Sequence, residues 1–107
     1  MGSKLKVEKW NSDSDGQLCL ENMEKKLSEQ GYSFTQYEFP PGTNFPNHTH
    51  GISKKDSIIS GRFQFSMFGE TVVLEPGDMV EVPLNTVHNA KVVGNSNVVF
   101  YDATVTR

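Results

Sequence analysis

The sequence predicts an all-β domain of short antiparallel strands with one helix near its start. Three observations indicate this fold class. Segments rich in aromatic and β-branched residues recur between residues 32 and 105. Turn-forming residues separate them at even spacing, as in 75–78 and 94–97. A single amphipathic stretch precedes them. This pattern is typical of an antiparallel sandwich or barrel.

The composition fits one globular domain over residues 1–107 and excludes several classes of partner. Of the 107 residues, 36% are hydrophobic and 21% are charged. The formal net charge of −3 does not favour a nucleic-acid partner, which needs a basic face. No apolar run is long enough to span a bilayer, so we expect no membrane partner. The single cysteine, Cys19, excludes a disulfide scaffold and favours a reduced, cytoplasmic location.

An N-terminal segment of mixed polarity covers residues 1–14, and residues 15–30 are predicted to form one amphipathic helix. Asp13 or Ser14 can cap its start, and Gly31 is the natural stop. We expect the Cys19 thiol to be buried within this helix rather than to act as a nucleophile. Apolar side chains recur there at helical spacing: Leu20, Met23 and Leu27.

The barrel is predicted to cover residues 32–105. Alternating apolar residues place Phe63, Phe65 and Met67 on one face of a strand. The expected strands are 32–39, 58–68, 71–74, 79–82, 87–93 and 98–105.

His48 and His50 are the first candidate site residues. On an extended segment, side chains two residues apart point to the same side. Both imidazoles could then bind one metal ion, because neutral imidazole is the commonest protein metal ligand. His88, the third and last histidine of the chain, lies in a second strand-like region. If His88 joins the other two, every histidine belongs to one site.

The spacing around these histidines resembles the two motifs of the cupin family. The first motif places a glycine six residues before His-x-His and another glycine after it, and the second places a glycine, a proline and a histidine in order. Asn85 takes a position that is usually glycine, a mild change because asparagine tolerates left-handed backbone geometry. The residues in register are Gly42, His48, His50 and Gly61 for the first motif and Gly77, Pro83 and His88 for the second.

The resemblance covers roughly residues 32–105 and implies a double-stranded β-helix, the jelly-roll barrel of cupins. It implies that His48, His50 and His88 hold a metal ion inside the barrel. Three imidazoles suit Fe, Zn, Mn, Ni or Cu without selecting one. The implied function is binding or converting a small polar or anionic molecule, with dioxygenase- or isomerase-like chemistry. The family's habit of pairing through its sheets also suggests a homodimer.

One departure from the family pattern is Lys54, which stands where the fourth ligand is usually glutamate. A protonated lysine has no lone pair to donate to a metal. Three alternatives follow. The site could hold a metal with three histidines and open positions. Asp56, on the same side of the strand, could pair with Lys54 or approach the metal. Lys54 could also replace the metal's charge, leaving a metal-free pocket that binds or senses a small molecule through Lys54 and Asp56.

Overall fold

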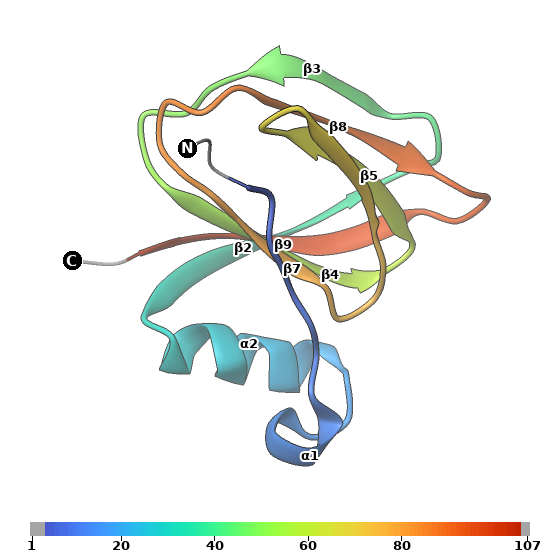
Figure 1. Ribbon diagram of the computed structural model, residues 1–107. Helices are drawn as coiled ribbons and strands as arrows, with labels where there is room; N and C mark the ends of the chain where they lie inside the picture. The colour runs from blue at the N-terminus through green and yellow to red at the C-terminus, as the bar shows by residue number, and fades with distance from the viewer. Residues whose placement is uncertain (1–3, 106–107) are drawn as a thin grey trace.

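The computed structural model describes residues 4–105, which form two facing antiparallel sheets with helices outside one of them (Figure 1). The five-stranded sheet has the spatial order β1-β7-β4-β9-β2, with bounds Val7–Glu8, Met79–Val82, Lys54–Ser60, Val98–Val105 and Tyr32–Phe39. The four-stranded sheet has the order β3-β8-β5-β6, with bounds Asn44–His48, His88–Val93, Arg62–Met67 and Glu70–Leu74. The expected all-β jelly-roll barrel is confirmed.

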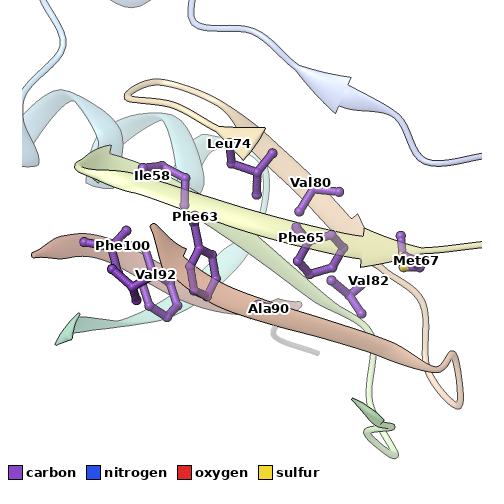
Figure 2. Packing of buried hydrophobic residues seen from close by; sticks show 11 residues of the cluster. Ile58, Phe63, Phe65, Met67, Leu74, Val80, Val82, Ala90, Val92 and Phe100 are labelled. Atoms are coloured by element: carbon purple, nitrogen blue, oxygen red, sulfur yellow. The ribbon is translucent and has the colours of Figure 1, made fainter. Parts of the chain in front are cut away.

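The main hydrophobic core fills the space between the two sheets (Figure 2). Because side chains alternate along a strand, every second residue of β5 points inward, as predicted for Phe63, Phe65 and Met67. The strands of the five-stranded sheet close the core from the other side. They contribute the buried side chains Ile58, Val80, Val82, Val98 and Phe100.

A second core lies outside the five-stranded sheet, under helix α2, Leu20–Glu29. Met23 and Leu27 of this helix are fully buried against residues of β7 and β9. Strand β9 serves both cores, since Phe100 faces the barrel while Tyr101 and Ala103 face the helix. Within residues 4–105, no helix is long and apolar enough to cross a membrane.

The prediction of one helix over residues 15–30 is wrong, because the structure has two helices. Helix α1 spans Ser12–Asp15 and is capped by Asn11. Gly16, with φ of 78°, ends it, and α2 starts only at Leu20. Gly31, with φ of 90°, follows the end of α2, so the predicted stop is confirmed.

The prediction of a buried Cys19 thiol is also wrong. Cys19 is exposed, and it caps the N-terminus of α2. Its Sγ accepts a hydrogen bond from the backbone N–H of Asn22 at 3.4 Å. Its apolar neighbours suggested a helix interior, but the backbone of Cys19 is extended and lies before the first turn.

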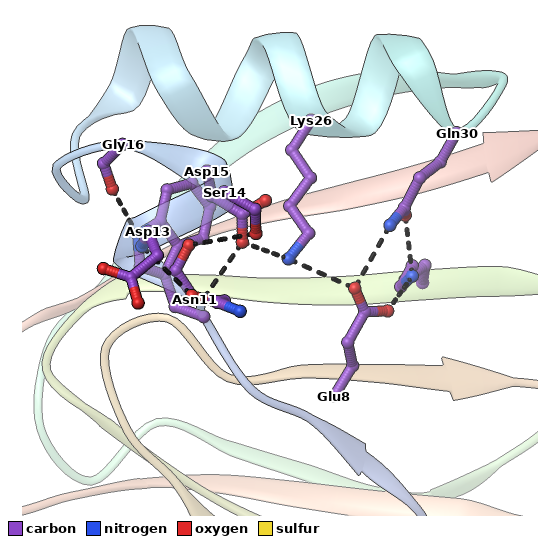
Figure 3. A network of polar contacts seen from close by, with 10 residues as sticks. Glu8, Asn11, Asp13, Ser14, Asp15, Gly16, Lys26 and Gln30 are labelled. Atoms are coloured by element: carbon purple, nitrogen blue, oxygen red, sulfur yellow. Dashed lines mark hydrogen bonds and ion pairs between the residues drawn. The ribbon is translucent and has the colours of Figure 1, made fainter.

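The N-terminal segment is fixed to the barrel by a network of charges (Figure 3). Strand β1 pairs with β7, and Glu8 accepts a hydrogen bond from the buried Lys55 at 2.6 Å. Gln30 Oε1 accepts a second bond from Lys55, and Lys26 lies 3.2 Å from Glu8. Partial burial alone would raise the pKa of Glu8, but its bonds with Lys55, Gln30 and Lys26 lower it below the ordinary value. The network joins β1, β4 and α2.

The predicted strand over residues 58–68 is wrong in the same way as the helix, since it contains a turn. Gly61, with φ of 80°, separates β4 from β5. A Cβ atom at Gly61 would lie 2.3 Å from the carbonyl oxygen of Asn97. The turn therefore needs glycine both for its backbone conformation and for this close approach.

We predict that Gly61→Ala destabilises the protein more than Gly69→Ala does. Both glycines have positive φ, so both variants lose about 1–2 kcal/mol to backbone strain. Only Gly61→Ala adds a clash with backbone, because nothing lies within 4 Å of the Cβ position at Gly69. Urea unfolding of the two variants measures the difference. Equal losses of unfolding free energy would contradict the packing at Gly61.

Candidate metal centre

The three histidines lie at one end of the four-stranded sheet. His48 ends β3 and His88 begins β8, and the two are register partners. His50 lies in the loop after β3, so the extended segment expected over both histidines ends at the first of them. The backbone N–H of Asn85, which has φ of 58°, donates to His50 O at 2.7 Å and joins the two loops.

The structure brings all three imidazoles together. His48 Nε2 and His50 Nε2 are 3.1 Å apart. The ring centroids of His48 and His88 are 4.2 Å apart, and those of His50 and His88 are 5.0 Å apart. One nitrogen of each ring lies within 4.8 Å of the others. Two nitrogens bound about 2.1 Å from one ion at roughly 90–110° are about 3.0–3.4 Å apart, so the His48–His50 separation fits a shared metal.

Backbone carbonyls orient two of the three rings. His48 Nδ1 lies 2.7 Å from Pro46 O, and His88 Nδ1 lies 2.8 Å from Thr86 O. A carbonyl only accepts hydrogen bonds, so each Nδ1 carries a proton and donates it. The lone pair of each neutral ring is then on Nε2, which faces the cluster. Such hydrogen bonds fix the tautomer and orientation of metal-binding histidines in many proteins.

The surroundings of His50 and His88 favour the neutral form of these two imidazoles. Burial lowers the pKa of His50, and the charges of Lys54, His48 and His88 lower it further. Burial also lowers the pKa of His88, although its hydrogen bond to Thr86 O acts in the opposite direction. A metal binds only the deprotonated ring nitrogen, so a lowered pKa keeps these two residues ready for a metal at neutral pH.

The histidines open into a pocket between the sheets with a cavity volume of about 220 Å³. Its polar side chains come from both walls. The imidazoles lie on the four-stranded side, while Lys54, Asp56 and Asp102 come from β4 and β9 of the other sheet. The rest of the lining is apolar or aromatic: Tyr37, Phe39, Phe45, Phe63, Phe65, Val82, Ala90 and Phe100.

Lys54 is paired with Asp102, a residue outside both histidine motifs. Lys54 Nζ donates to Asp102 Oδ2 at 2.9 Å, and both side chains are about one-fifth exposed. Lys54 therefore does not pair with Asp56, one of the alternatives considered above. A signal for Asp102 exists in the sequence, because it lies two residues after Phe100 and so shares its inward face of β9.

Asp56 lies in the pocket wall, but it is not part of the imidazole cluster. Among residues 4–105, the group able to hold a metal consists of His48, His50 and His88 alone. Burial raises the pKa of Asp56 to about 7, and the charge of Asp102 adds to this, while Lys54 lowers it. Asp56 thus titrates near neutral pH rather than staying ionised throughout.

We predict that Asp56 makes the metal-free protein less stable as the pH rises. Between its ordinary pKa of 3.8 and about 7, the folded state keeps a proton that the unfolded state has lost. Stability is then lost as the pH rises through this window. The Asp56→Asn variant cannot ionise at this position, so it does not lose this stability as the pH rises. The difference between its unfolding free energy and that of the wild type should therefore increase by roughly 2–3 kcal/mol from about pH 5 to pH 8.

Urea unfolding at both pH values measures this difference. Asp13→Asn, at an exposed position of α1, is the control and should show no such change. An Asp56→Asn difference that is the same at both pH values would show that Asp56 ionises in the ordinary range for aspartate.

Comparison with known proteins supports the motifs and the fold. The family described as "Cupin domain" matches residues 35–104, which is about two thirds of the chain. No curated protein matches. Among solved structures, KdgF from Halomonas sp. is 23% identical over 72% of each chain, with a TM-score of 0.62. A predicted oxalate decarboxylase from Thermotoga maritima is 22% identical over 78% of this chain and 74% of that one, with a TM-score of 0.63.

A third similar structure is the DMSP lyase DddQ from Ruegeria pomeroyi DSS-3. It is 22% identical, with a TM-score of 0.63, and the match covers 71% of this chain but only 39% of that one. At these identities, the similarity of the three structures establishes the fold and not the reaction. The match to the family covers eight of the nine strands in part or whole and all three histidines. The chain belongs to the cupin family.

Proposed function

We propose that this protein is a small metal-binding cupin that binds or converts a small molecule inside its barrel. His48, His50 and His88 would hold one divalent transition metal, such as Fe, Zn, Mn, Ni or Cu. The observation that carries the proposal is the pair of Nδ1–H bonds to Pro46 O and Thr86 O. These bonds turn the Nε2 lone pairs toward a common point beside a pocket.

When bound, the metal would supply a Lewis acid with open positions for water or a ligand. The chain's own residues provide the rest of the site. Aromatic side chains from both sheets line the pocket. Protonated Lys54 cannot ligate the metal. Its ion pair with Asp102 partly neutralises its positive charge near the imidazoles. Dioxygenase- or isomerase-like conversion is the chemistry that we propose for such a site.

The pocket favours a small molecule with an apolar body and a polar head. Its volume of about 220 Å³ lies below the roughly 300 Å³ at which pockets for drug-sized ligands begin. Lys54 and Asp102 offset each other's charge, so an anionic head would have to use the N–H groups of Lys54 that Asp102 leaves available. We also propose, from family membership, that the protein forms a homodimer.

A metal-free binding or sensing module is the second candidate function. One observation favours it, since the Lys54 charge acts on both His50 and His88. A cation close to these imidazoles disfavours a divalent ion in the same enclosed space. In that case Lys54 and Asp56 would supply the polar contacts to the small molecule.

We predict that the protein binds about one equivalent of a transition metal. Metal-free protein is loaded with the metal, the excess is removed, and the bound metal is then measured. His50→Ala should lose most of this metal, because His50 is a loop residue whose removal spares the strands. Thr49→Ala, at the exposed position between two histidines, should keep it. Elemental analysis measures the content. Less than about a tenth of an equivalent in the wild type would exclude a resident metal and favour the metal-free module.

We predict that metal also stabilises the fold. A free metal concentration of 100 times the dissociation constant should add about 2.7 kcal/mol to the free energy of unfolding. A chelator should reverse the gain, and His50→Ala should show none of it. Thermal melts of wild type and His50→Ala, with and without metal, test this. Identical melting temperatures in all four samples would contradict metal binding to the folded state.

A further inference from the structure

The polar groups of the two pocket walls gather at the same end of the barrel. On the four-stranded sheet, His88 pairs with Met67, while Val92 pairs with Phe63 four residues further along. On the other sheet, Lys54 pairs with Val82, while Ile58 pairs with Phe100. Figure 2 shows Phe63, Phe100 and Val92 at one end of the core and Met67 and Val82 at the other. A bound molecule can thus touch an aromatic end and a polar end.

Asp56 and Asp102 face each other across adjacent strands at the polar end. They are register partners in the β4–β9 pair, and both line the pocket. Asp102 Oδ2 accepts from Lys54, but its Oδ1 is buried and has no hydrogen-bond partner. A buried acceptor without a donor is unfavourable. A proton on the facing Asp56 carboxyl would provide the missing donor.

The surroundings of Asp56 leave its charge less well compensated than that of Asp102. Lys54 on its own strand is bonded to Asp102, and the neighbouring strand β7 offers only Val80 as register partner. The other ionisable groups of the pocket are Tyr37 and, on the facing wall, His48, His50 and His88. The one cation of the pocket is therefore bonded to Asp102, and Asp56 has no such partner among the pocket residues.

We propose that Asp56 carries the exchangeable proton of this pocket, shared with Asp102 in the free protein and donated to an acceptor oxygen of a bound small molecule. The apolar body of that molecule, such as an aromatic ring, lies against the phenylalanines at the other end. Asp102 and Lys54 act as positioning residues. The raised pKa of Asp56, about 7, agrees with this role. This proposal rests on one part of the proposed function, namely that the pocket binds a small molecule. It does not require a bound metal.

Full proton transfer needs no further reactant. The O–H bond of Asp56 breaks, and the proton forms a new O–H bond on the acceptor oxygen of the bound molecule. The electron pair stays on the Asp56 carboxylate, whose new charge lies near the Lys54 ammonium. A general acid with a pKa near the working pH can give up its proton and regain it in each cycle.

The first test is carboxyl-carbon NMR of the metal-free protein, with Asp56 assigned through Asp56→Asn. Asp56 should titrate near neutral pH in wild type. Asp102→Asn should lower its pKa, since the neighbouring negative charge is lost, and Lys54→Met should raise it. Lys91→Met, which removes an exposed cation of β8, should leave it unchanged. Opposite shifts in two variants distinguish this network from a general loss of structure. Titration of Asp56 below pH 5 in wild type would overturn the proposal.

The second test uses benzoate, which has an aromatic body and acceptor oxygens, with the metal-free protein. Its dissociation constant should rise about tenfold per pH unit above the pKa of Asp56, because only the protonated carboxyl donates to the anion. Asp56→Asn keeps a donor, so its affinity should be independent of pH over the same range. Calorimetry and the Asp56 resonance report binding. The same pH dependence in both proteins, or no saturable binding at any pH, would overturn the assigned role.

These tests separate the proposal from the metal site. Neutral titration of Asp56 and pH-linked benzoate binding in a protein that retains no metal would support the proton donor and refute the metal centre. A protein that binds one metal but whose Asp56 titrates below pH 5 would support the metal centre and refute the proton donor.

Discussion

The alternation of side chains along β4 and β9 is the constraint on which the rest of the structure depends. Each strand of the five-stranded sheet has a barrel face and a helix face. In β4, Lys54 and Asp56 point into the pocket, whereas Lys55 between them points to β1 and α2 and bonds with Glu8 and Gln30. A shift of β4 by one residue would place Lys55 in the pocket instead of Lys54 and would remove Asp56 from it, and the same shift of β9 would remove Asp102.

This alternation also explains why the site has two chemically distinct walls. The four-stranded sheet and its loops present three imidazoles, and the five-stranded sheet presents one ammonium and two carboxyls. A small enclosed volume with so many ionisable groups is stable only if their charges offset one another. The Lys54–Asp102 pair provides part of this balance, and the proton that we propose for Asp56 would provide the rest.

The sequence predicts much of the fold and one wall of the site. The spacing around His48, His50 and His88 identified the barrel and the meeting of the three rings, because the motif encodes where strands end. Local signals misled near turns and caps. The turn at Gly61 is short and lies between two β-prone runs, and Cys19 lies between two leucines. Asp102 was missed for a different reason. It is 48 residues from Lys54, and only the register of β4 on β9 shows that they meet.

Anomalous diffraction from crystals of metal-loaded protein would test the central claim most directly. We expect one peak at the absorption edge of the bound metal, about 2.0–2.2 Å from a ring nitrogen of each of the three histidines. Lys54 should remain bonded to Asp102 beside the occupied site. No peak among the imidazoles, with the Lys54 ammonium turned toward them instead, would contradict this expectation.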